Sequence, residues 1–181
     1  MSYIQTKHTQ LVLAREMCRA IRDNSPREEI SSIIRKGASP DGIFGYRPLM
    51  HATKKNNLPV MEELLINNAD PNKGGIIYRF SSIGYARPIH IAAKNLNNEA
   101  AILLIKFGAD PKRKIGGLFW AGDEKNPQPI FMADPYQIAY SQCFFLDSDN
   151  SPSIYRTEGE IRAAVWNNIP ILTQYRSIRR L

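Results

Sequence analysis

Two segments of the chain align with each other without a gap, and this internal repeat limits the possible folds more than any other feature. Residues 47–72 read RPLMHATKKNNLPVMEELLINNADPN, and residues 87–111 read RPIHIAAKNLNNEAAILLIKFGADP. Both copies begin with Arg-Pro, carry an alanine at the same position (Ala52 and Ala92) and continue to Ala-Asp-Pro. Self-similarity on this scale indicates stacked structural units rather than one closed core.

Each copy has the pattern of two short helices joined by a turn. The proline takes the first position of the first helix, where its missing N–H is not needed for hydrogen bonding. Apolar residues in the second helix recur at i, i+4 and i+5, as at Val60, Leu64 and Leu65. Asn68 and Gly108 follow the second helix, where a left-handed residue commonly ends a helix. The pattern therefore predicts a helix–turn–helix unit.

Weaker copies extend the array in both directions. DPYQIAYSQC at 134–143 has proline and alanine at the repeat positions, and EIRAAVWNN at 160–168 places apolar residues, Trp166 among them, where a second helix needs them. EEISSIIRKGASPD at 28–41 ends in a variant of Gly-Ala-Asp-Pro. The expected organisation is a single domain over 1–168, with units at about 10–41, 42–72, 84–111 and 134–168, followed by a basic C-terminal tail or capping helix at 169–181.

This pattern resembles the ankyrin repeat, in which a Thr-Pro-Leu-His-x-Ala-Ala helix and a second helix recur about every 33 residues. The chain departs from the motif, since Arg47, Arg87 and Asp134 replace the threonine and the motif histidine is present at His90 alone among the three copies. The resemblance implies an all-α ankyrin-repeat helical solenoid with extended β-hairpin finger loops. It also implies that His90 hydrogen-bonds between neighbouring repeats, so we expect a structural histidine.

The units are farther apart than in the resembled family. The starts of the clear copies and of the next copy are separated by 40 and 47 residues, against about 33 in the family. The additional residues fall in the finger loops at 73–86 and 112–133, and a further insertion at 144–159 separates the two helices of the last unit. Loops of this length inside a compact domain are commonly functional.

The finger loops are the best candidates for binding residues, because aromatic side chains and arginine anchor many protein interfaces. In the resembled family, partners usually bind the concave surface formed by the fingers and the first helices. Transferring that surface to this chain names Tyr78, Arg79, Phe80, Tyr85, Phe119 and Trp120 on the fingers, and Met50, His51, Ile91 and Lys94 on the first helices. The alternative is that the finger aromatics pack against each other as a small satellite core.

The charge of the chain favours an acidic partner. The formal net charge is +7 at pH 7. A positive charge favours binding to an acidic protein, a nucleic acid or an anionic lipid surface, although it also promotes solubility. None of the common nucleic-acid-binding patterns is present, so we expect a protein with an acidic surface. No stretch approaches the ~20 apolar residues of a membrane helix, and the polar start lacks the apolar core of a secretory signal. We therefore expect a cytoplasmic protein, in the producing cell or in a host cell.

The sequence lacks the usual signatures of catalysis. It has no phosphate-binding glycine loop, no HExxH and no GxSxG. Cys18 and Cys143 lie far apart and have no metal-ligand spacing, and the Glu62-Glu63 pair is expected on a solvated helix face. We expect that the protein is not an enzyme and that it binds no cofactor, metal or small-molecule substrate.

The function that these observations favour is a non-catalytic protein–protein interaction module. The family resemblance adds that short ankyrin-repeat proteins of bacteria and viruses often act on host proteins as effectors, or inhibit a cognate toxin or effector. Two alternatives remain open at this point. One is an enzyme whose site is built in the 112–159 insertions, and the other is nucleic-acid binding through the basic patches.

Overall fold

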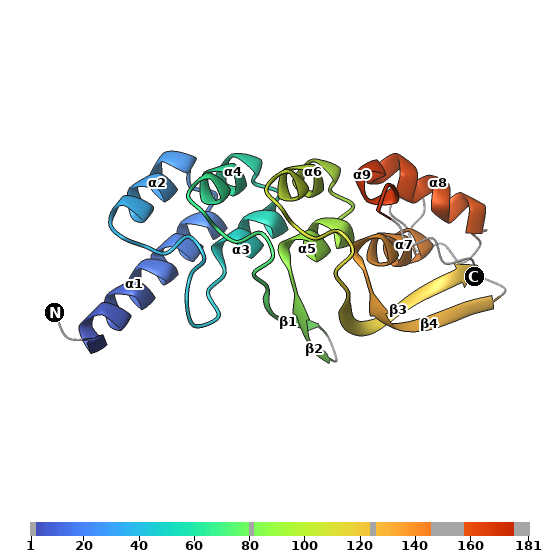
Figure 1. Ribbon diagram of the computed structural model, residues 1–181, viewed down its shortest axis with the longest axis horizontal. Helices are drawn as coiled ribbons and strands as arrows, with labels where there is room; N and C mark the ends of the chain where they lie inside the picture. The colour runs from blue at the N-terminus through green and yellow to red at the C-terminus, as the bar shows by residue number, and fades with distance from the viewer. Residues whose placement is uncertain (1–2, 80–81, 124–125, 146–157, 176–181) are drawn as a thin grey trace.

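Helices stand side by side in two rows along the molecule (Figure 1). The computed structural model describes the backbone of residues 3–79, 82–123, 126–145 and 158–175, and the side chains of 6–76, 85–116, 132–140 and 160–175. The first helices of the units are α1 (Tyr3–Arg22), α3 (Pro48–Lys55), α5 (Pro88–Lys94) and α7 (Pro135–Phe145). The second row contains α2 (Arg27–Arg35), α4 (Leu58–Ile66), α6 (Asn98–Lys106), α8 (Glu158–Asn168) and α9 (Pro170–Thr173).

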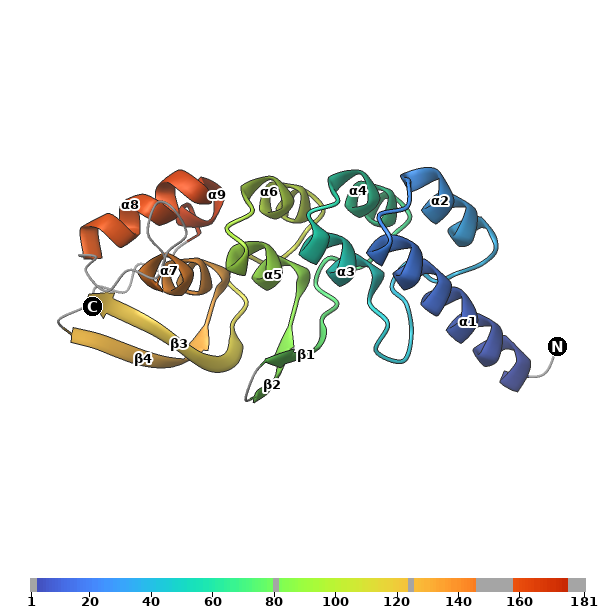
Figure 2. The same cartoon turned by 180° about the vertical axis from the view of Figure 1, so that it is seen from behind.

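Two antiparallel hairpins connect the later units. In the first, β1 (Gly75–Arg79) pairs with β2 (Ser82–Ala86) in a regular register from Gly75 opposite Ala86 to Arg79 opposite Ser82. In the second, β3 (Ile115–Asp123) pairs with β4 (Asn126–Ala133), with an irregularity between Gly116 and Phe119. Figures 1 and 2 show both hairpins projecting on the same side of the helices as the loop between α2 and α3.

Left-handed residues end the first helices at equivalent positions. Asn24, Asn56 and Leu96 have φ values of 57°, 54° and 53°, and each follows its helix by one or two residues. Asparagine tolerates this conformation well, whereas leucine does so rarely. These three residues give a structural alignment of the first three units that is independent of sequence similarity.

The core runs through all units without a break. It contains the small motif residues Ala52, Ala92 and Ala93, which have no exposed surface, together with large residues such as Met17 and Leu104. Small side chains at these positions allow neighbouring helices to approach closely. The arrangement confirms the predicted all-α repeat solenoid, in which each unit packs against the next.

A similar hydrogen bond holds the turn that follows each of α2, α4 and α6. In each case a side-chain oxygen accepts from the backbone N–H of the residue after the unit's Gly-Ala or Asn-Ala. The bonds run from Ser39 N to Gln10 Oε1 (3.2 Å), from Asp70 N to Asp41 Oδ1 (2.8 Å) and from Asp110 N to Asn72 Oδ1 (2.8 Å). The first bond lies within the first unit, and the other two join successive units. The three turns thus use three different accepting side chains.

The last unit differs from the expectation. The short helix α9, which follows α8, lies against α6, and Ile171 N donates to Asn98 Oδ1 at 3.2 Å. Val165 is buried as predicted, but Trp166 is 60% exposed. The prediction that Trp166 is an apolar packing residue is therefore wrong, because the described residues include no further repeat beyond α8 that would cover its ring.

The acidic pair in α4 is also less solvated than predicted. The Glu63 carboxylate accepts from Ser31 Oγ at 2.6 Å and from Arg27 Nη2 at 2.7 Å, which ties α4 to α2. These bonds, that from Ser31 foremost, lower the pKa of Glu63. Glu62 lies 3.8 Å from Arg27 at a more exposed position. The pair is a structural link between two helices of the second row.

Candidate functional site: the first helices and the finger loops

The arginines that replace the motif threonine hold the first finger against the helices. Arg47 Nε donates to the Gly74 carbonyl at 3.0 Å, and Arg87 Nε donates to the Asn72 carbonyl at 2.9 Å. The Arg87 guanidinium also lies 5.5 Å from the centre of the Tyr85 ring, within the range of a cation–π contact. Both departures from the motif therefore fix the position of the β1–β2 hairpin.

His90 is fully used in hydrogen bonding. Its Nδ1 accepts from the backbone N–H of Arg87 at 3.3 Å, so Nε2 carries the proton and donates to the Arg113 carbonyl at 2.7 Å. The ring is 2% exposed. The pKa of His90 is lowered to about 4, mainly by burial and also by the charge of Arg87, although the bond to Arg113 opposes this. The neutral ring ties α5 to the base of the second finger, which confirms the structural role predicted for His90.

The first cysteine has the properties of a core residue. Cys18 is buried, and burial raises the pKa of its thiol to about 12, although Arg22 and the bond from the Arg47 backbone oppose this. A thiol of this kind stays protonated at neutral pH and is a poor nucleophile. The side chain of Cys143, in α7, lies outside the described residues.

The described residues also contain few features of other site types. Among them, no group of three His, Cys, Asp or Glu side chains could hold a metal ion. Within the same residues, no helix is long and apolar enough to cross a membrane.

A cation lies in the last turn of each of α1, α3 and α5, the first helices of the first three units. Arg22, Lys54 and Lys94 are exposed, and each stands two residues before the left-handed residue that ends its helix. We call these three residues the basic row. In the described part of the chain, Arg22 and Lys54 take part in no ion pair.

The pKa of His51 is affected by the first two members of this row, Arg22 and Lys54. The side chain is half-buried beside α1 and α3. Burial lowers its pKa, and the charges of Arg22 and Lys54 lower it further. The charges of Arg22 and Lys54, from two successive units, therefore both act on this one imidazole.

Exposed apolar side chains lie on every loop that joins two units. We call the following set the apolar edge: Phe44 on the α2–α3 loop, Ile76 and Tyr85 on the first hairpin, and Met132 on the second. The Tyr85 hydroxyl accepts from Gly74 N at 3.1 Å, and the Arg87 contact lies on the same ring. The ring is therefore held in place while part of it faces solvent.

The structure separates the residues that the sequence nominated on the first helices. His51 and Lys94 lie with the basic row, and Ile91 is half-buried against the core. Met50 is only 7% exposed, because it occupies the same motif position as the buried His90. The buried Met50 side chain packs in the core, so we leave it out of the candidate surface.

The nominated finger residues are described to different extents. Tyr85 is exposed. Tyr78 and Arg79 lie in β1, and Phe119 and Trp120 lie in β3, but their side chains are outside the described set. Phe80 is outside the described residues altogether.

Sequence reasoning missed several residues of the surface. The ungapped repeat alignment already places Lys54 opposite Lys94, but this match was not used in predicting the surface. Arg22 becomes equivalent to both only when the helix ends are aligned by their left-handed residues. Phe44 could have been suspected, because GIFGY places an aromatic residue between two glycines in a segment equivalent to a finger.

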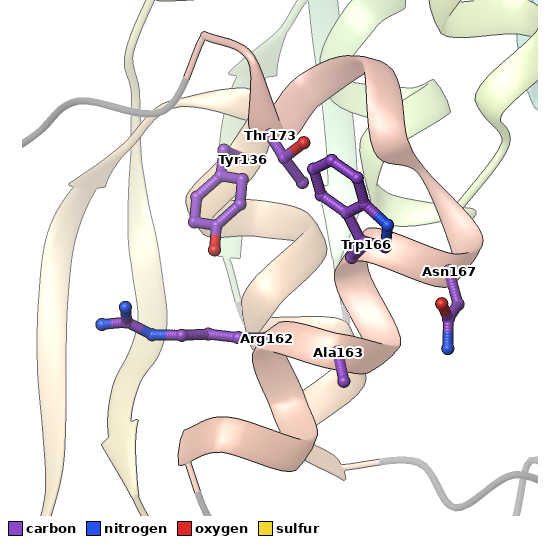
Figure 3. Close-up of a pocket in the computed structure, with 6 residues that line it drawn as sticks. All are labelled: Tyr136, Arg162, Ala163, Trp166, Asn167 and Thr173. Atoms are coloured by element: carbon purple, nitrogen blue, oxygen red, sulfur yellow. The ribbon is translucent and has the colours of Figure 1, made fainter.

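An open groove of about 450 Å³ lies at the C-terminal end of the described stack. Tyr136 of α7, Thr173 of α9 and four residues of α8 line it: Arg162, Ala163, Trp166 and Asn167. Figure 3 shows the Trp166 ring beside Thr173, with Arg162 extending away from them. The Thr173 hydroxyl donates to the Pro170 carbonyl at 2.6 Å, so it is not poised as a nucleophile.

Comparison with protein families identifies the repeats. A family model of ankyrin repeats matches residues 17–115 in three copies. No curated protein matches the chain at the significance required. Repeats of this family are generally protein–protein interaction modules and are typically not enzymes. Because the match covers more than half of the chain and agrees with the stacked helix pairs, the chain belongs to the ankyrin-repeat family.

Proposed function

We propose that the chain binds a protein partner with an acidic surface, and that it does so through the basic row and the apolar edge. The observation that carries this proposal is the exposed cation at the equivalent position of three successive units, Arg22, Lys54 and Lys94. Charges in register along a rigid stack suit an extended acidic segment, because one segment can meet all three. Such complementarity raises association rates and selects the partner.

The proposed contact combines electrostatic attraction with apolar anchors. Phe44, Ile76, Tyr85 and Met132 are the exposed apolar residues of the loops. Anchors of this type supply much of the binding energy in protein interfaces, whereas exposed charges act more on encounter and selectivity. A preformed surface of this kind serves an effector that acts on a host protein, or an inhibitor of a cognate toxin, and we include both roles in the proposal. The cytoplasm of the producing cell or of a host is the proposed site of action.

A simpler reading of the basic row must be tested against this one. Cations in the last turn of a helix interact favourably with the helix dipole, by about 0.3–1 kcal/mol each. Arg35 in α2 and Lys106 in α6 are exposed last-turn cations of the second row. They share the dipole effect but lie outside the basic row, and they therefore give a matched control.

The experiment starts from a displayed library of random peptides selected on the wild-type chain. We expect the enriched peptides to be net acidic, and the best of them serves as the probe in a fluorescence titration. The double variant Arg22→Glu/Lys54→Glu should weaken its binding by about tenfold or more, which corresponds to roughly 1.4 kcal/mol. The control Arg35→Glu/Lys106→Glu has the same net charge and should stay within about twofold of wild type. Equal weakening in both variants, or enrichment of neutral peptides, would contradict the proposal.

A further inference from the structure

The loop between α2 and α3 contains a residue that its own turn disfavours. Tyr46 N donates to the Ile43 carbonyl at 2.9 Å, and the two residues between them, Phe44 and Gly45, have φ values of 48° and 86°. These values are those of a type I′ turn. Such turns strongly prefer Asn, Asp or Gly at the first central position, and a bulky residue there is a conformational outlier.

Packing does not explain why phenylalanine occupies this position. Phe44 is 66% exposed, more than any other large hydrophobic residue among the described side chains. The loop itself is tightly built, since a Cβ atom on Gly42 would lie 2.0 Å from the Tyr46 carbonyl oxygen. A tightly packed loop backbone thus places an aromatic ring in solvent at a conformational cost. Strained residues of this kind persist mainly where function requires them.

The ring borders an open groove that has a cationic rim. The groove measures about 380 Å³ and lies between the loop and the first turns of α1, which contribute Thr6, Lys7 and Gln10. Arg47 and Lys73 complete the rim, and Asp41 pairs with Lys73 at 3.0 Å. The lining therefore has more positive than negative charge around one exposed aromatic ring.

The groove is positioned to extend the candidate surface. Figures 1 and 2 show the α2–α3 loop and the N-terminal half of α1 projecting on the side of the hairpins. A segment that crosses the apolar edge can therefore continue past Phe44 without turning around the stack.

We infer that this groove binds the acidic segment of the protein partner at a point where that segment carries an aromatic or aliphatic side chain, which packs on the Phe44 ring. This inference rests on the proposed function and names the first apolar anchor of its surface. The cations on the rim select carboxylates beside the apolar side chain, and the strained turn keeps the ring available before the partner arrives. A pre-organised anchor of this type lowers the entropic cost of binding.

The test compares three chains in parallel peptide selections: wild type, Phe44→Asn and the control Ile66→Gln. Asparagine suits the left-handed position and removes the ring, whereas Ile66 is an exposed apolar residue of the second row. We expect peptides enriched on wild type and on Ile66→Gln to combine acidic residues with an aromatic or aliphatic residue. Peptides enriched on Phe44→Asn should stay acidic but lose that apolar preference, and the best wild-type peptide should bind Phe44→Asn about tenfold more weakly.

The possible failures of this experiment are distinct. Acidic peptides with no difference between wild type and Phe44→Asn would overturn the inference and leave the proposed function intact. If the enriched peptides were apolar in a Phe44-dependent way but carried no acidic residues, the partner would not be acidic. That result would contradict both the acidic surface in the proposed function and the acidic segment proposed for this groove. No enrichment on any chain would overturn both proposals.

A stability measurement excludes a purely structural role for the ring. Because asparagine and glycine adopt positive φ more readily, Phe44→Asn and Phe44→Gly should unfold at the same temperature as wild type or a few degrees higher. A lower midpoint for both variants would show that the ring packs on its own chain, and would overturn the inference. Binding to vesicles of phosphatidylserine and phosphatidylcholine, if lost in Phe44→Asn, would assign the ring to a membrane surface and overturn it as well.

Discussion

The third and fourth units use different residues to cap the N-terminus of their first helix. At the start of α5, His90 Nδ1 accepts from Arg87 N at 3.3 Å. At the start of α7, Gln137 Oε1 accepts from Asp134 N at 3.0 Å, and Asp134 Oδ1 accepts from Gln137 N at 2.9 Å. The second arrangement is a capping box, in which the two side chains satisfy each other's backbone donors.

The difference lies in what the side chain at the histidine position does besides capping. His90 has a second nitrogen, which reaches the Arg113 carbonyl at 2.7 Å and so connects α5 to the loop that follows the third unit. The bonds described for Gln137 stay within the first turn of α7. The histidine therefore combines a local cap with a long-range tie, and the two contributions can be separated by mutation.

The largest effect is expected for His90→Ala. The substitution removes both hydrogen bonds and leaves a cavity at a site that is 2% exposed. We expect it to lower the free energy of unfolding by about 3 kcal/mol, measured by urea denaturation followed by circular dichroism.

His90→Gln is the matched control for this loss. A glutamine there can accept from Arg87 N, as Gln137 accepts from Asp134 N, and should recover about 1 kcal/mol of the loss. If His90→Gln and His90→Ala were equally unstable, capping would contribute nothing in the third unit, and the comparison with the fourth would fail.

The second prediction concerns pH. The folded pKa of His90 is about 4, below its ordinary value of 6.5. The unfolded chain therefore binds more protons between these values, and stability falls as the pH decreases through that window. We expect His90 to account for a loss of about 2 kcal/mol between pH 7 and pH 5.

Urea titrations of wild type and His90→Gln at both pH values isolate this contribution. His51 contributes with the same sign below its ordinary value of 6.5, since burial, Arg22 and Lys54 also lower its pKa, but it is present in both chains. The lowered pKa of Glu63 has its effect below its ordinary value of 4.5. An equal loss of stability in the two chains would show that His90 is not the group that titrates.

The repeat alignment made part of this comparison predictable. It identified His90 as a motif residue, and the same alignment puts Met50 at the equivalent position, so the burial of Met50 follows from the motif. The partner of His90 was not predictable, because Arg113 belongs to an insertion whose path depends on how the second hairpin begins. The roles of Arg47 and Arg87 likewise depend on where the first hairpin places the Gly74 and Asn72 carbonyls.

The candidate surface was harder to predict than the fold, for physical reasons. Core positions repeat because each unit must bury the same face, whereas an exposed position such as Arg22 is free of that constraint and leaves a weak sequence signal. The Phe44 turn shows a second reason. A type I′ turn is predicted from Asn-Gly or Asp-Gly. Phe44-Gly45 does not match this preference, so the turn and the exposed ring at Phe44 could not be predicted from the sequence.

The smallest expected effect is that of Asp134→Ala. The alanine removes one cap from α7, in which Asp134 Oδ1 accepts from Gln137 N, and caps of this kind contribute about 1 kcal/mol. Asp134→Thr restores the motif residue and keeps a side-chain oxygen at the same place, so it should lose about half as much. Urea denaturation of both variants beside His90→Ala gives the order of effects. A loss for Asp134→Ala that equals or exceeds that of His90→Ala would mean that the fourth unit depends on Asp134 beyond the first turn of α7, and that the two units differ less than these hydrogen bonds indicate.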